Sequence, residues 1–100
     1  MISTLAMAKA IKEKEANPSI RLVDVRTPSE YREGHIPGAI NIPLQELRRF
    51  LVTIPDKSEK IFVYCAHGFR AAQAADGLFR LGYLNITNIG GIADYTGRVE

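Results

Sequence analysis

A chain of 100 residues, of which 46% are hydrophobic, has room for one modest core, so we expect residues 1–100 to form a single domain. The 13 basic and 11 acidic residues leave a net charge of +2, which is too balanced to indicate a nucleic-acid partner. No apolar stretch approaches the roughly 20 residues that span a bilayer, and no secretory signal is recognisable. We therefore expect a cytoplasmic protein with no membrane partner.

The first part of the sequence alternates between helical and strand patterns. Apolar residues recur at helical spacing over residues 4–16, and Asn17-Pro18 ends that pattern, so an amphipathic helix is predicted there. Residues 20–25 are too apolar for a surface edge and predict a buried strand. Thr27-Pro28-Ser29-Glu30 has the pattern of a capping box, which predicts a short helix that stops at Gly34.

The second part continues the same alternation. A Pro-Gly turn and a short strand are predicted over residues 36–42, followed by a helix that begins at Pro43. One face of that helix carries four apolar residues, which are Leu44, Leu47, Leu51 and Ile54. Residues 61–64 are all apolar and predict a central strand, residues 69–81 predict an alanine-rich helix, and residues 86–89 predict a last strand.

Strands that alternate with helices predict an α/β fold, with a central parallel sheet of about four to five strands and helices on both faces. Ligands of such sheets bind outside the carboxyl ends of the strands. Three loops leave strands at that edge, and they contain Arg26-Thr27, residues 65–69 and Gly90-Gly91. We expect the functional site among these loops, with Gly90-Gly91 allowing a close backbone approach.

Cys65 is the single cysteine, so the fold has no internal disulfide, and the residue is either a small buried hydrophobe or a reactive thiol. It lies where a buried strand turns directly into a helix, next to unpaired amides at the positive end of the helix dipole. Gly68 can take a positive φ, and Arg70 adds a permanent positive charge. These features favour the thiolate and predict that Cys65 is a nucleophile.

The chain resembles the rhodanese homology domain from about Leu22 to about Gly97. The resemblance rests on several blocks in order, which are Leu22-Val23-Asp24-Val25-Arg26, Glu30-Tyr31, Gly34-His35-Ile36-Pro37-Gly38-Ala39, Asn41-Ile42-Pro43, the loop from Cys65 to Arg70, Leu81-Gly82-Tyr83 and Gly90-Gly91. Each block alone is weak, but together at these spacings they are specific.

The resemblance implies a thiosulfate sulfurtransferase without a metal or another cofactor. Cys65 would take a sulfane sulfur from a donor such as thiosulfate and pass the resulting persulfide sulfur to cyanide or a thiol. The cradle around the outer sulfur would be formed by Ala66, His67, Gly68, Phe69 and Arg70. The partners are then small sulfur donors and acceptors, or proteins of a sulfur relay, and we expect a monomer.

Two other functions use a similar loop. Phosphatases and arsenate reductases of the related fold place five residues between cysteine and arginine, whereas only four separate Cys65 from Arg70. A persulfide carrier that serves other proteins would need the same residues as the enzyme, so the two remain alternatives. A third alternative is a rhodanese-like interaction module without activity, but such modules usually lack the cysteine, so Cys65 argues against it.

Structural roles, not catalytic ones, are expected for several residues near the loop. We expect Asp24 and Arg26 to form a structural ion pair, and His35 to be a structural hydrogen-bonding residue. The Arg70 side chain is expected to brace the loop against a carboxylate such as Asp24, while its amide faces the sulfur. His67 is either a ligand for donor anions or a solvent-facing loop residue.

Overall fold

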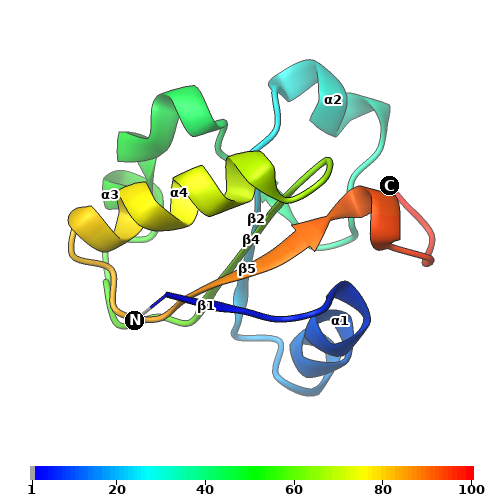
Figure 1. Cartoon of the computed structure of the whole chain (residues 1–100), viewed down its shortest axis with the longest axis horizontal. Helices are drawn as coiled ribbons and strands as arrows, with labels where there is room; N and C mark the ends of the chain where they lie inside the picture. Colours follow the sequence, from blue (N-terminus) through cyan, green and yellow to red (C-terminus); the bar gives the residue numbers. More distant parts are fainter. Residues whose placement is uncertain (1) are drawn as a thin grey trace.

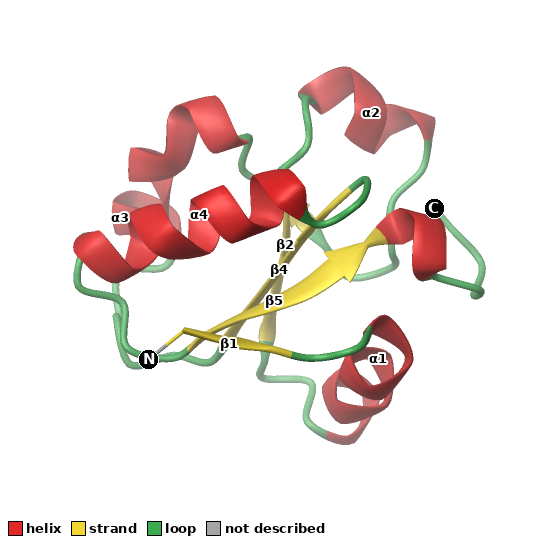
Figure 2. Cartoon of the chain, viewed as in Figure 1, coloured by secondary structure: helices red, strands yellow, loops and turns green. Residues whose placement is uncertain are grey.

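The computed structural model describes residues 2–100 and shows one five-stranded sheet in which all strands are parallel, in the order β1-β5-β4-β2-β3 (Figure 1). The strands are β1 (Ile2–Thr4), β2 (Arg21–Asp24), β3 (Ile40–Asn41), β4 (Ile61–Cys65) and β5 (Ile86–Gly91). The helices are α1 (Met7–Ala16), α2 (Pro28–Glu33), α3 (Phe50–Thr53) and α4 (Phe69–Arg80), with 3₁₀ segments η1 (Leu44–Arg49) and η2 (Ile92–Asp94) (Figure 2). The predicted α/β class and the upper strand count are confirmed.

Two cores lie on the two faces of the sheet, because successive side chains of β4 point to opposite sides. Val63 and Cys65 pack on the face covered by α3 and α4, while Phe62 and Tyr64 pack on the face covered by α1. Every residue of β4 is buried, as predicted for a central strand. None of the helices within residues 2–100 is long and apolar enough to span a membrane.

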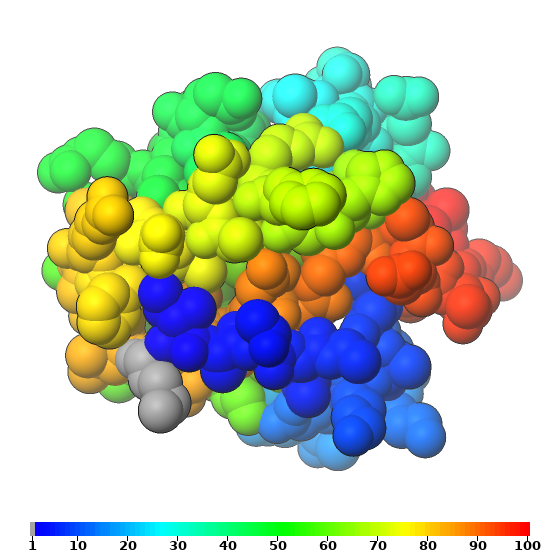
Figure 3. Space-filling model, viewed as in Figure 1, coloured from blue at the N-terminus to red at the C-terminus, as the bar shows by residue number. Residues whose placement is uncertain are grey.

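The predicted start of the first helix is wrong. Residues 2–4 form strand β1, which pairs with β5 in the register Thr4↔Asn88, and α1 begins only at Met7. This strand is exposed and lies on the sheet edge, so its own sequence carries no burial signal. Figure 3 shows the N-terminal segment, in blue, running across the near face of the molecule beside α4. Because of β1, strand β5 has neighbours on both sides.

The continuous helix predicted after Pro43 is also wrong. The backbone forms the 3₁₀ segment η1, departs from helical angles at Glu46 (φ −117°, ψ 35°), and becomes α-helical only over α3. The amide of Leu44 bonds the carbonyl of Val25 at 3.0 Å, so the start of the segment is tied to the end of β2. The four apolar residues nevertheless face the core as predicted, since Ile54 is buried and the three leucines pack against the core cluster to which it belongs.

Candidate active site

Cys65 is the last residue of strand β4, and its side chain lies inside the turn that leads into α4. The residue is 1% exposed, and a register shift between Val63 and Cys65 marks the end of regular pairing with β5. The Sγ atom accepts hydrogen bonds from the amide of Gly68 at 3.0 Å and from the amide of Ala71 at 3.3 Å. These two donors sit at the N-terminus of a 12-residue helix, so they present positive partial charge to the sulfur.

Further amides of the same turn remain available. Within residues 2–100, the backbone N–H groups of His67, Phe69 and Arg70 donate to no protein acceptor. The amides that bond the resting Sγ belong to Gly68 and Ala71, and the Arg70 amide, which we expected to face the sulfur, is not one of these two donors. The turn therefore holds Sγ with two amides and keeps others free for an anionic group next to it.

The shape of the turn depends on two glycines. Gly68 has φ 101°, a left-handed conformation that a side chain would strain. Gly91 lies so close to the turn that an added Cβ would clash with the carbonyl of Ala66 and the Cα of His67. The close approach predicted at Gly90-Gly91 is thus confirmed at Gly91. The amide of Ala93 also donates to the Ala66 carbonyl at 3.2 Å, which ties the turn to segment η2 directly after β5.

Arg70 braces the turn from outside, but its partner is Glu30 and not Asp24 as expected. Its two terminal nitrogens donate to the two Glu30 oxygens at 2.7 and 3.0 Å. Glu30 also completes the predicted capping box by accepting from the Thr27 amide at 3.0 Å. The hydrogen bonds from Arg70 are the main reason why the pKa of Glu30 falls from 4.5 to about 2. The pair joins the starts of α2 and α4.

Asp24 forms an ion pair with Arg26, as predicted. Nε and Nη2 of Arg26 reach the Asp24 carboxylate at distances of 2.7 to 3.1 Å, and both residues are buried. His35 also has the structural role expected of it, because its ring stacks on Tyr31 and its Nδ1 lies 2.9 Å from the Tyr31 carbonyl. The side chains of Asp24, Arg26 and His35 therefore stabilise the fold through contacts with other residues of the chain.

The buried Sγ of Cys65 is thus held by backbone amides at the start of α4. A family model for the rhodanese-like domain matches residues 7–98. The chain belongs to the rhodanese family.

Individual rhodanese relatives span much of the chain. It is 42% identical to a thiosulfate sulfurtransferase, PspE of Escherichia coli, over 72% of this chain and 70% of that protein. It is 32% identical to a putative sulfur carrier protein, YrkF of Bacillus subtilis, over 92% of this chain but only 50% of that protein. A solved E. coli rhodanese with anions superimposes with a TM-score of 0.76 at 38% identity, covering 81% of this chain and 96% of that one.

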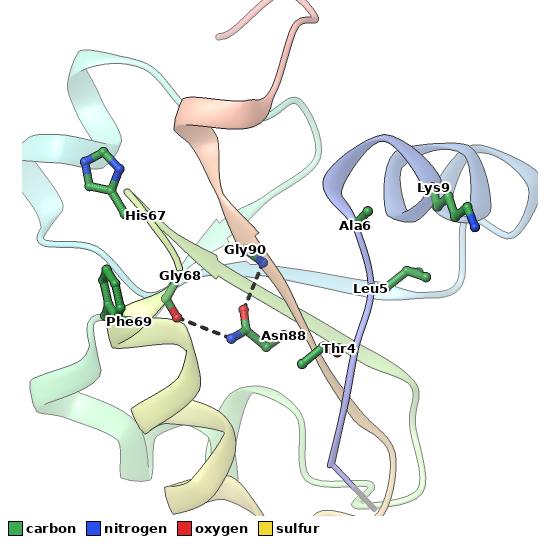
Figure 4. Close-up of a pocket in the computed structure, with 9 residues that line it drawn as sticks. All are labelled: Thr4, Leu5, Ala6, Lys9, His67, Gly68, Phe69, Asn88 and Gly90. Atoms are coloured by element: carbon green, nitrogen blue, oxygen red, sulfur yellow. Dashed lines mark hydrogen bonds between the residues drawn. The ribbon is translucent and has the colours of Figure 1, made fainter.

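The outer side of this rhodanese loop borders an open groove of about 550 Å³ (Figure 4). His67 is exposed and Phe69 is 81% exposed, and both line the groove, whereas Cys65 does not. The opposite wall comes from residues 4–6 and Lys9. Asn88 lines it as well and bonds the turn directly. Asn88 does not stand out in the sequence, because an asparagine inside a strand carries no chemical motif.

Proposed function

We propose that this rhodanese is a sulfurtransferase that carries sulfane sulfur as a persulfide on Cys65. The Cys65 thiolate attacks the outer sulfur of thiosulfate, the S–S bond of the donor breaks, and sulfite leaves with the bonding electrons. Cyanide or a thiolate then attacks the outer sulfur of the persulfide, and Cys65 leaves as a thiolate. The result is thiocyanate or a new persulfide, with no cofactor in either step.

The observation that carries the proposal is the amide cradle around Sγ. A persulfide places a second, anionic sulfur beyond Sγ, and the amides of His67, Phe69 and Arg70 have no protein acceptor within residues 2–100. Preorganised amides in a partly desolvated turn stabilise developing charge without reorganisation. In this proposal Ala66 and Gly68 supply backbone shape, while the Arg70 side chain holds the turn through Glu30.

Loop length supports sulfur over phosphate as the transferred group. Four residues separate Cys65 from Arg70, which makes a small ring of amides. A tetrahedral oxyanion needs a wider cradle, and the Arg70 guanidinium is already bonded to both Glu30 oxygens and so is not free to bind one. We therefore infer that aryl phosphates are poor substrates.

The test is intact-mass spectrometry of the protein after exposure to thiosulfate. Cys65 should become heavier by one sulfur atom, and cyanide should remove that mass while thiocyanate appears. Cys65→Ser should do neither, yet melt close to the native protein, since the side chains have nearly the same size. An unmodified Cys65 together with turnover of an aryl phosphate would refute the proposal.

A persulfide carrier is the second candidate, favoured by the likeness to a putative sulfur carrier protein and by the exposed ring of Phe69 beside a buried sulfur. In that case a protein persulfide should load Cys65 much faster than thiosulfate does. Comparing the two loading rates at equal donor concentration separates carrier from enzyme. Faster loading by thiosulfate would exclude the carrier.

A further inference from the structure

Asn88 connects the last strand to the cysteine turn through both ends of its side chain. Its Nδ2 donates to the carbonyl of Gly68 at 3.2 Å, and its Oδ1 accepts from the amide of Gly90 at 2.9 Å. Figure 4 shows the side chain lying between these two glycines. A single amide group therefore bridges the carboxyl end of β5 and the start of α4.

The backbone of Asn88 is fixed before its side chain makes these bonds. Asn88 is paired with Val63 of β4 on one side and with Thr4 of β1 on the other, and its carbonyl accepts from the Leu5 amide at 3.1 Å. Side-chain bonds from an internal strand position start from a rigid base. Asn88 thus transmits the geometry of the sheet to the turn.

Gly68 links Asn88 to the sulfur, because it forms hydrogen bonds with both. Its amide donates to Sγ of Cys65 at 3.0 Å, while its carbonyl accepts from both Asn88 and the amide of Ala72. A glycine with φ 101° has few steric barriers of its own, so its orientation depends on hydrogen bonds. Holding its carbonyl also fixes the peptide plane whose other end is the free amide of Phe69.

We propose that Asn88 is a positioning residue, which acts through Gly68 to aim the amides of the cradle at the sulfur of Cys65. This inference rests on the proposed function where it concerns sulfur transfer. The hydrogen bonds themselves already hold the turn around the unmodified thiol. Two variants separate the two bonds of Asn88. Asn88→Ala removes both, and Asn88→Asp keeps the shape and the bond from Gly90 but loses the donor to Gly68.

The matched control is Asn41→Ala. Asn41 likewise donates from its side chain to backbone carbonyls, those of Asp24 and Arg26, at 2.9 and 3.0 Å, but it holds a different loop. The readouts are the rate of Cys65 alkylation by iodoacetamide as a function of pH, the rate of persulfide loading from thiosulfate, and the melting temperature. A purely structural residue would change only the last of these.

Both Asn88 variants should slow alkylation at neutral pH by at least about fivefold, because the hydrogen bond from the Gly68 amide to the sulfur is weakened. Asn41→Ala should lower the melting temperature without this change. A native alkylation rate in either Asn88 variant, or an equal loss in Asn41→Ala, would overturn the inference. If thiosulfate fails to load even the native protein, the proposed function fails, and the alkylation comparison still decides the role of Asn88.

Discussion

Replacing Glu30 by glutamine should remove the ion pair that joins α2 to α4 while leaving the helix cap in place. Glutamine is an accepted residue at the third position of a capping box, so the bond to the Thr27 amide can persist. What is lost is the charge that both Arg70 nitrogens share. The variant therefore isolates the electrostatic part of the brace on the cysteine turn.

The magnitude follows from the pKa of Glu30, which falls from 4.5 to about 2 chiefly because Arg70 donates to the carboxylate. At about 1.36 kcal/mol for each unit of pKa, that difference corresponds to about 3 kcal/mol of stability. Both side chains are 31% exposed, and solvent screening reduces the expected contribution to about 1–2 kcal/mol. For a chain of this length, the melting temperature of the variant should fall by about 5–10 °C.

The pH dependence has a definite sign. The folded-state pKa of Glu30 lies below its unfolded value, so the unfolded chain binds more protons between pH 4.5 and about 2. The stability that Glu30 contributes is complete above pH 4.5 and is lost as the pH falls through that window. The difference between the native protein and Glu30→Gln should accordingly shrink toward zero at the acid end.

Urea unfolding of both proteins at several pH values measures this difference. Glu46→Gln is the matched control, because Glu46 pairs with Arg49 at 3.2 Å with both side chains more than half exposed, and such a pair contributes at most about 0.5 kcal/mol. A Glu30→Gln loss that is the same at acid and neutral pH would refute the electrostatic reasoning. So would a loss no larger than that of the control.

Three further substitutions test the packing of the site. Gly91→Ala should lower the free energy of unfolding by more than about 2 kcal/mol, because its Cβ would clash with the backbone of the turn. Its control, Gly38→Ala, has φ 87° and open space around the added Cβ and should lose only about 1–2 kcal/mol. Equal losses of the two variants in urea unfolding would contradict the close approach at Gly91. Gly68→Ala should slow alkylation of Cys65 as well as destabilise, and a purely thermal effect would argue against its role in the cradle. Tyr64→Phe should cost about 1–3 kcal/mol, since the buried amide of Ile36 loses its acceptor; an unchanged unfolding midpoint would show that the amide finds another partner.

Much of the site follows from local sequence. The capping box from Thr27 to Glu30, the all-apolar strand before Cys65 and the left-handed glycine at position 68 each depend on residues a few positions apart. Short-range patterns of this kind determine hydrogen bonds and side-chain periodicity within one element. For that reason the sequence alone determined the α/β class, the two-sided burial of β4 and the place of the cysteine at the start of a helix.

Other features were decided only by the folded chain. Residues 2–4 become a strand because β5 offers a free edge, and the segment after Pro43 leaves helical geometry where its start is tied to β2. The partner of Arg70 is 40 residues away in sequence, and Asn88 is 20 residues from the glycine that it holds. Such pairings depend on which strand ends the topology brings together. Local patterns do not encode that proximity, so the place of Cys65 at the start of a helix could be predicted from sequence, whereas the contacts of Arg70 and Asn88 that hold the turn could not.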